Sequence, residues 1–229
     1  MEISLSKRLA AIAEFVSKGD VIADVGTDHG YLPAWLIQNG ICSAAIASDI
    51  RERPLHSAVQ SADAAGVADR IDFRLCAGLE AYEKDDASCI VIAGMGAETI
   101  IGILSAAPWT KGKKLILQPQ TKHNLLRFWL SDNGYGISDA RLVYDTGRIY
   151  IVYHVSGNHK SDCGIVSRHL IERRDTLLVP FIDEEIKKLM NKLSGLEKSK
   201  SHNAEDINEI KAQIMELKSI KLEAQSWQQ

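Results

Sequence analysis

Short apolar runs alternate with amphipathic segments from the start of the chain to about Ser156. The apolar runs have the length of strands buried on both faces of a sheet. They predict strands at Val21–Val25, Ala44–Ser48, Ile71–Leu75, Cys89–Ala93, Lys114–Gln118, Ala140–Tyr144 and Ile149–Val155. The amphipathic segments predict helices at Leu5–Val16, Leu32–Gln38, Pro54–Ala65, Ala97–Ala106 and Asn124–Asp132. This alternation is typical of an α/β domain with a mostly parallel sheet.

The last two predicted strands are too close together for a crossover helix. The residues Asp145-Thr146-Gly147 lie between them, and a connection this short joins antiparallel neighbours. We therefore expect an α/β domain over residues 1–156 whose seven-stranded sheet ends in an antiparallel hairpin.

The pattern becomes heptad-like after Ser156-Gly157-Asn158. Apolar residues recur at steps of three and four in two stretches, Ile182, Ile186, Leu189 and Leu193, then Ile207, Ile210, Ile214 and Leu217. Each stretch predicts a helix, and the polar segment 198–203 separates them. We expect a helical hairpin in a second domain over residues 160–229. Its mixed charges fit either a solvated surface or a partner-binding one.

Composition and charge fit a globular protein. Of the 229 residues 45% are hydrophobic and 25% charged, which excludes a disordered chain and a disulfide-stapled miniprotein. No apolar run reaches the roughly 18 residues that cross a bilayer, and the first residues do not resemble a signal peptide, so we expect a cytoplasmic protein with no membrane contact. The net charge of −3 does not indicate nucleic-acid binding, so any basic surface is a local patch.

The four cysteines do not form a metal or dithiol motif. Cys42, Cys76, Cys89 and Cys163 lie far apart, without a C-x-x-C pair or a histidine at zinc spacing. We expect reduced thiols and no bound metal.

A glycine-bearing turn follows the first predicted strand. It reads Gly26-Thr27-Asp28-His29-Gly30, and Asp49 ends the next predicted strand. Glycine at this place lets the backbone approach a ligand closely, and an acidic residue at that distance takes ribose hydroxyls. The turn alone is weak evidence, because many α/β loops need glycine for their geometry.

Charge in this loop separates two classes of ligand. A dinucleotide's pyrophosphate favours bare amides in a G-x-G-x-x-G loop, whereas Asp28 stands at the place of the second glycine. A carboxylate about 4–6 Å from two phosphate charges costs several kcal/mol at an effective dielectric of about 20. S-adenosylmethionine (SAM) carries a sulfonium and an ammonium group but no phosphate, so the loop favours this methyl donor over NAD.

Four segments together resemble the bacterial tRNA (adenine-22-N1)-methyltransferases. They are Asp24–Pro33, Ile92–Ala97, Leu115–Gln120 and the helical tail. The resemblance extends over essentially the whole chain and implies a Rossmann-like class I methyltransferase domain followed by a coiled-coil-like domain. The chain departs from the family at Cys76-Ala77, where Gly-Asp is frequent, and at Ala97, where a second glycine is frequent.

The resemblance implies an enzyme that uses SAM to methylate N1 of adenine 22 in tRNA. The sequence leaves the oligomeric state open between a monomer and a weak homodimer. We expect Gly26 beneath the methionine moiety and Asp49 on the ribose. The expected cofactor-binding residues are Asp24, Gly26, Thr27, His29, Gly30, Asp49, Ile50, Gly78, Leu79, Ala93, Gly94, Met95 and Gly96. The expected tRNA contacts are Lys7, Arg8, Gln118, Gln120, Lys122 and Arg127.

The chemistry expected of the site is transfer to a ring nitrogen. Segment 93–96 lacks the Asp/Asn-Pro-Pro-aromatic run that holds an exocyclic amine, and adenine N1 already has an in-plane lone pair, so alignment is the main requirement. Asp28 is the expected catalytic residue, because its carboxylate would meet the positive charge that develops on the base. The alternative for Asp28 is an N-cap of the next helix.

Other functions stay open on the residues alone. A methyltransferase acting on another RNA, a small molecule or a protein fits the same loop, and so does a non-catalytic nucleotide-binding module whose helical hairpin recruits partners.

Overall fold

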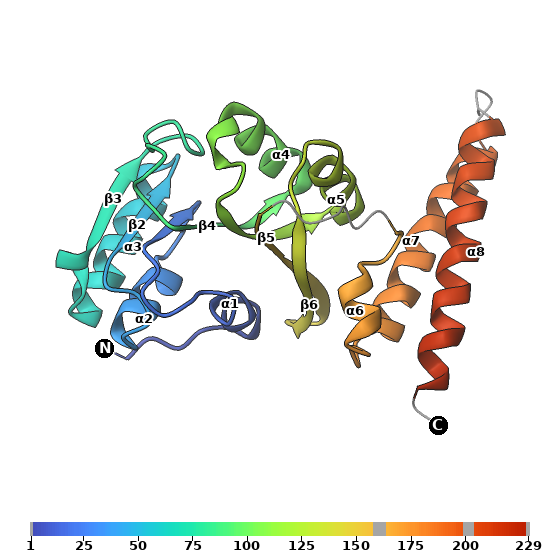
Figure 1. The fold of residues 1–229 in the computed structure, drawn as a ribbon, viewed down its shortest axis with the longest axis horizontal. Helices are drawn as coiled ribbons and strands as arrows, with labels where there is room; N and C mark the ends of the chain where they lie inside the picture. The colour runs from blue at the N-terminus through green and yellow to red at the C-terminus, as the bar shows by residue number, and fades with distance from the viewer. Residues whose placement is uncertain (1, 158–163, 199–203, 228–229) are drawn as a thin grey trace. The chain divides into compact units, whose positions relative to one another are not determined.

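A seven-stranded sheet forms the centre of the first part of the chain (Figure 1). The strand order is β3-β2-β1-β4-β5-β7-β6, with β1 to β5 parallel and β7 antiparallel to both β5 and β6. The strands are β1 Ile22–Val25, β2 Ala45–Asp49, β3 Ile71–Leu75, β4 Cys89–Gly96, β5 Lys114–Thr121, β6 Ile137–Asp145 and β7 Arg148–Val155. The predicted fold class, including the antiparallel terminal hairpin, is confirmed.

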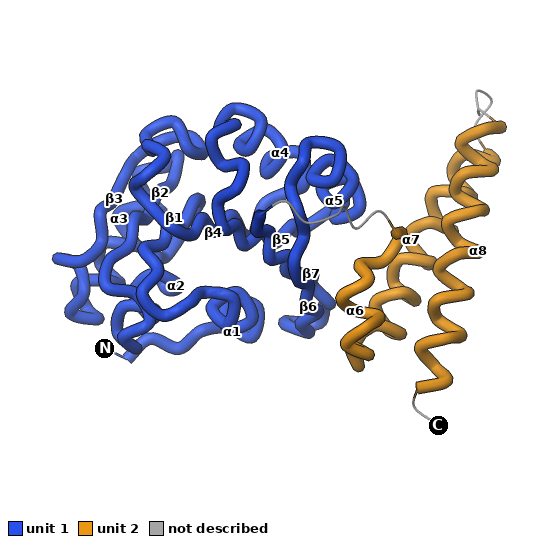
Figure 2. The backbone as a smooth tube through the Cα atoms, in the orientation of Figure 1, with its two compact units in different colours: residues 1–162 blue, residues 163–229 orange. Residues whose placement is uncertain are grey.

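This computed structural model describes residues 2–157, 164–198 and 204–227. The chain divides into two compact units, residues 1–162 and residues 163–229, drawn in blue and orange in Figure 2. The residues around our expected domain boundary, 158–163, lie outside the described part, as do most of the polar residues between the two long C-terminal helices.

Helices cover both faces of the sheet. They are α1 Lys7–Ala13, α2 Tyr31–Gln38, α3 Glu52–Ala65, α4 Ala97–Ala106 and α5 His123–Asp132, with short 3-10 turns η1 Ala68–Arg70 and η2 Pro108–Thr110. In Figure 1, α1 and α2 lie below the sheet and α4 and α5 above it. All residues of β1 and β2 are buried, as expected of parallel strands between two helical layers.

Local interactions set several boundaries that the apolar pattern left imprecise. Helix α1 begins at Lys7 rather than Leu5 because the Ser6 hydroxyl accepts the N–H of Leu9 and caps the helix. Strands β4 and β5 run about three residues past their predicted ends, since Gly96 still pairs with Thr121 beyond a bulge at Gly94. Both extensions bring backbone to the edge of the sheet where the candidate site lies.

The connection between β6 and β7 is a two-residue turn. Thr146 and Gly147 both have positive φ, +48° and +82°, which is the backbone pattern of the type I′ hairpin turn. The expected antiparallel hairpin therefore has the tightest usual connection.

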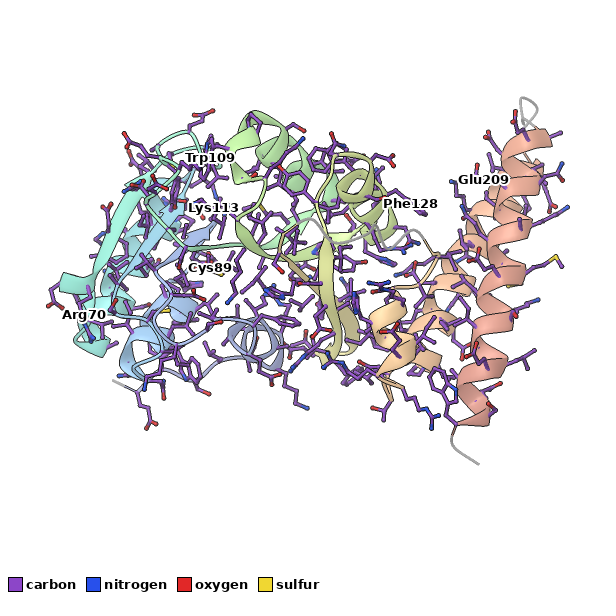
Figure 3. All side chains as sticks on the ribbon, in the orientation of Figure 1. Arg70, Cys89, Trp109, Lys113, Phe128 and Glu209 are labelled. Carbon is purple, nitrogen blue, oxygen red and sulfur yellow. The ribbon has the colours of Figure 1, made fainter. Side chains whose placement is uncertain are left out.

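Two cysteines belong to the core of the first unit. Cys89 lies inside this unit (Figure 3), and both Cys42 and Cys89 are buried. Burial raises the pKa of Cys42 to about 11 and that of Cys89 to about 12, so both thiols stay protonated at neutral pH. They are packing residues rather than reactive groups.

The second unit consists of helices α6 Arg168–Glu172, α7 Leu178–Lys198 and α8 Ala204–Ser226. The apolar seam is formed by Ile182 and Ile186 of α7 and by Ile210, Ile214 and Leu217 of α8, all of them buried. Two ion pairs link the helices. Asp183 near the start of α7 pairs with Lys221 near the end of α8, and Glu197 at the end of α7 pairs with Lys211 in the first half of α8. The helices are therefore antiparallel, as expected of two helices joined by a short polar segment. Among the described helices, none has the length and apolar content that a membrane span requires.

Candidate functional site

A cavity of about 590 Å³ lies at the carboxyl ends of the parallel strands. Its walls are the ends of β1, β2, β4 and β5 and the loops after β1, β2 and β3, together with residues of α1, α2 and α4. The chain switches sides of the sheet between β1 and β4, and ligands of open α/β sheets bind in the crevice at such a switch point. The cavity is thus where the fold itself predicts a ligand.

The loop after β1 is held against the end of β2. The backbone N–H groups of Gly26 and Thr27 both donate to the carbonyl of Ser48, at 2.8 Å each. Gly26 has φ +77°, and a Cβ there would come within 2.2 Å of the Met95 side chain, so only glycine leaves this approach open. The Ser48 hydroxyl is fixed in turn by the Tyr82 hydroxyl, which donates to it at 2.7 Å.

Three carboxylates give the cavity a negative character. Asp24 and Asp49 are buried at the strand ends, and Thr27 donates a hydrogen bond of 2.6 Å to Asp24. Burial raises the pKa of Asp24 to about 6, against the effect of that hydrogen bond and with a further rise from the charge of Asp49. Asp49 accepts the N–H of Arg51 at 2.9 Å. A cationic ligand is the electrostatic match for such a site.

Asp28 is the third carboxylate and is open to the cavity. Its side chain is 64% exposed and lies 3.7 Å from the His29 imidazole. Helix α2 begins after Gly30, and no side chain of the described residues caps it, so the N-cap alternative for Asp28 is wrong. The backbone of Asp28 has φ +53°, a left-handed conformation that Asp and Asn tolerate better than other side chains.

An aromatic pair stands next to Asp28. The rings of His29 and Tyr31 stack at a centroid distance of 5.4 Å with an interplanar angle of 13°. Both line the cavity, and Tyr31 is 38% exposed. Tyr31 is absent from the predicted site. Its signal was an aromatic residue in the first turn after the glycine loop, where the side chain faces the cavity rather than the core.

A buried glutamine organises the opposite wall. Gln118 is 0% exposed. Its side-chain oxygen accepts both the N–H of Gly94, at 3.1 Å, and the Nη1 of Arg8, at 2.8 Å, while its Nε2 donates to the Pro119 carbonyl at 2.9 Å. The prediction that Gln118 contacts tRNA is wrong, because the side chain is fully buried and its polar atoms are bonded to Arg8, Gly94 and the Pro119 carbonyl.

The structure brings most of the predicted residues together. Those that line the cavity are Arg8, Asp24, Gly26, Thr27, Asp28, His29, Asp49, Ile50, Gly78, Ala93, Gly94, Met95 and Gln120. Gly30, Leu79 and Gly96 do not line it. A Cβ at Gly30 would lie 2.8 Å from that of Ala58, so this glycine serves the packing of α2 on α3. Leu79 is buried in the core, and Gly96 precedes the first residue of α4.

The predicted basic contacts separate in the same way. Arg8 faces the cavity, Lys7 is exposed, and Lys122 is exposed with its amine paired to Glu98. Arg127 is only 1% exposed and stacks on Phe128. It is placed on the inner side of α5 next to Leu126, so the prediction of Arg127 as a phosphate contact is wrong.

Cys76 and Ala77 stand in the cavity wall at the place where the family pattern has Gly-Asp. The N–H of Cys76 donates to the Asp49 carbonyl at 3.1 Å, which ties this segment to the end of β2. The wall therefore has no carboxylate at this place, and its backbone is held to the end of β2.

The fold and this site define a class I methyltransferase, and comparison with known proteins agrees. Residues 5–153 match the family model for a methyltransferase domain. The tRNA (adenine(22)-N(1))-methyltransferase of Bacillus subtilis is 39% identical over 153 residues, which are 66% of this chain and 64% of that protein's length.

Two solved structures extend the likeness to the second unit. The Bacillus subtilis m1A22 tRNA methyltransferase has a TM-score of 0.85 and 29% identity, over 96% of this chain and 100% of that one. A Streptococcus pneumoniae "putative tRNA (m1A22) methyltransferase", solved in complex with SAM, has a TM-score of 0.83 and 32% identity, over 95% of this chain and 100% of that one. The chain belongs to the tRNA (adenine-22-N1)-methyltransferase family, and the resemblance seen in its motifs is confirmed.

Proposed function

We propose that this protein transfers a methyl group from SAM to N1 of adenine 22 in tRNA. The observation that carries the proposal is the acidic cavity at the switch point, where Asp24, Asp28 and Asp49 suit a cationic donor without phosphate. The acceptor follows from the family, since relatives named for this adenine cover nearly the whole chain.

The donor would lie across the ends of β2, β1 and β4. Asp49 would accept the ribose hydroxyls, with the exposed Ile50 and the Cys76–Gly78 segment beside the adenine ring. The open backbone at Gly26 leaves room for the methionine moiety. When bound, SAM supplies a methyl group on a sulfonium that leaves as a neutral thioether.

The acceptor side would be served by Asp28. As the N1 lone pair forms the new bond to carbon, the adenine ring gains one positive charge, which spreads onto its exocyclic nitrogen. The exposed Asp28 carboxylate stabilises that charge and accepts a hydrogen bond from the amino group. The backbone at Ala93 and Gly94 leaves space for a flat base without offering a side-chain amide or carboxylate to an amine.

The tRNA would bind around the mouth of the cavity. Lys7 is exposed next to the cavity-lining Arg8, and Lys122 is exposed two residues after the cavity-lining Gln120. We assign the helical unit of residues 163–229 to holding the folded RNA. Phosphate contacts by exposed lysines position an RNA without reading its sequence, so the choice of adenine 22 would depend on the cavity.

The test is a methylation assay on an unmodified tRNA that carries adenine 22 and on a matched tRNA with guanine at that position. Radiolabelled SAM should yield 1-methyladenosine at position 22 of the first and no product with the second. Methylation at another nucleotide, or SAM binding without transfer to either tRNA, would contradict the proposal.

A further inference from the structure

Charge is distributed unevenly around the mouth of the cavity. Asp24, Asp28 and Asp49 belong to the ends of β1 and β2 and the loop after β1, on one side of β4. The other side, toward β5 and β7, has exposed cations at Lys7 and Arg148. An RNA whose base enters the cavity keeps its phosphates at the mouth, where the acidic side repels them and the basic side attracts them.

The turn between β6 and β7 lies at the same edge of the sheet as the cavity. Strand β7 is antiparallel to β5, so β7 begins where β5 ends, and Gln120 near the end of β5 lines the cavity. The turn is also attached to a cavity residue, because the Asp145 carboxylate accepts the backbone N–H of Arg8 at 3.1 Å. The guanidinium of Arg8 lies 5.7 Å from the centre of the Tyr150 ring on β7. The β6–β7 turn therefore forms part of the rim of the cavity.

Two exposed cations lie next to Asp145 in this rim. Arg148 is its register partner across the hairpin, and directly opposite residues of antiparallel strands share a face of the sheet. Lys7 precedes Arg8, the residue whose N–H Asp145 accepts. Neither Lys7 nor Arg148 has a carboxylate within ion-pair distance among the residues that the structure describes. Both cations can therefore bind an anion from outside the protein.

The backbone of the turn is strained as well as tight. A type I′ turn needs positive φ at both central residues and favours Asn-Gly or Asp-Gly. Here Thr146 has φ +48°, and a β-branched residue in the left-handed region is uncommon and costs about 1 kcal/mol or more. The chain thus keeps a short, fixed turn at the rim at some expense of stability, which is usual where a backbone serves a binding site.

We propose that Arg148 of the β6–β7 turn, together with Lys7, binds backbone phosphates of the tRNA beside the target adenine. The inference rests on the proposed function for the identity of the partner. It adds to the predicted contact at Lys7 a segment of the chain in which no site residue was predicted.

The geometry favours phosphates over base edges at this place. The methylated base lies inside the cavity, so its own phosphate and those of its neighbours are the groups that reach the rim. The net charge of the chain is −3, which repels a polyanion from most of the surface, and a local basic rim then decides where the RNA approaches. Lys122 contributes less to this rim, because its amine is paired with Glu98.

Counterion release sets the size of the expected effect. One phosphate contact contributes about 0.7 to 0.9 to the slope of log K against log salt concentration, which at 0.1 M salt is about 5- to 8-fold in affinity. Arg148→Gln should therefore weaken tRNA binding by about that factor and reduce the slope by about 0.7 to 0.9. The double variant with Lys7→Gln should lose about 25- to 60-fold, since the two contacts are separate.

The experiment measures the affinity of the full chain for a labelled, unmodified tRNA that carries adenine 22, by fluorescence anisotropy at several salt concentrations. Arg148→Lys keeps the charge and should stay within about 2-fold of the wild type. The matched control is Arg70→Gln. Arg70 is an exposed arginine directly before β3, at the opposite edge of the sheet (Figure 3), and its loss should change neither the affinity nor the slope. Calorimetry should give the same S-adenosylhomocysteine affinity for every variant.

Three results would overturn the inference. The first is an unchanged affinity and salt slope in Arg148→Gln. The second is an equal loss in Arg70→Gln, which would show that only the total charge of the chain matters. The third is an equal loss in Arg148→Gln and Arg148→Lys at an unchanged slope, which would make Arg148 a residue that shapes the hairpin. If Arg148→Gln does not fold, Lys7→Gln takes its place with the same expected loss and the same refuting result. Failure of the wild-type chain to bind or methylate this tRNA would instead refute the proposed function.

Discussion

Replacing Asp28 by Asn removes one charge from the cavity and little else. The side chain keeps its size, Asn tolerates the left-handed backbone at φ +53°, and no helix loses a cap. We therefore expect the melting temperature to stay within about 1 °C of the wild type, since none of the usual sources of large destabilisation is involved.

The expected loss of turnover follows from the charge that the carboxylate meets. Two opposite charges about 4 Å apart attract by about 4 kcal/mol at an effective dielectric of about 20. Because the Asp28 side chain is 64% exposed, solvent screens part of this energy, and about half is a reasonable share. A loss of about 2 kcal/mol in the transition state corresponds to a roughly 30-fold slower transfer.

The assay is a single-turnover reaction at saturating SAM and tRNA, with the affinity for SAM measured separately. Asp85→Asn, a substitution of an exposed carboxylate outside the cavity, is the matched control. Transfer by Asp28→Asn at the wild-type rate would refute the catalytic role. A loss that disappears when donor binding is corrected for would make Asp28 a residue of the donor site only.

Three further predictions concern the donor half of the cavity. Asp49→Ala should weaken SAM binding about 10- to 100-fold with the fold intact, as measured by calorimetry and circular dichroism; unchanged affinity would remove Asp49 from the site. Gly26→Ala should lower SAM affinity because its Cβ would displace Met95 and strain a backbone at φ +77°, whereas Gly40→Ala, also at positive φ but in open space, should leave it unchanged. The raised pKa of Asp24 means that the native state binds its proton more tightly than the unfolded chain does, so stability is lost as pH rises from about 4 to about 6. Asp24→Asn should therefore raise Tm at pH 7.5 and have little effect on Tm near pH 4. An equal change in Tm at the two pH values would contradict the raised pKa of Asp24.

The sequence predicted the sheet and its helices because their signals are local. Apolar runs mark each central strand, and the heptad steps from Ile182 and from Ile207 mark the two long helices. Residue types and their spacing also located the glycine loop and both strand-end carboxylates. These features can be predicted because they depend on residues close together in the sequence and not on contacts between distant parts of the chain.

The errors in the site have a common physical cause. A polar or charged residue type does not say which way its side chain faces. Gln118 stands near a strand end yet is buried and bonded to Arg8 and Gly94. Arg127 follows Leu126 onto the buried side of α5. Tyr31 shows the reverse, an aromatic residue that the structure leaves open in the cavity. Only the tertiary arrangement decides these orientations.

Two consecutive carbonyls at the end of β2 have a consequence for the thermodynamics of ligand binding. Ser48 accepts the amides of Gly26 and Thr27, and Asp49 accepts that of Cys76, so one strand end anchors both backbone segments that would surround the donor. These segments are ordered before any ligand arrives. Association then loses little backbone conformational entropy, and more of the contact energy remains as affinity for a small donor molecule.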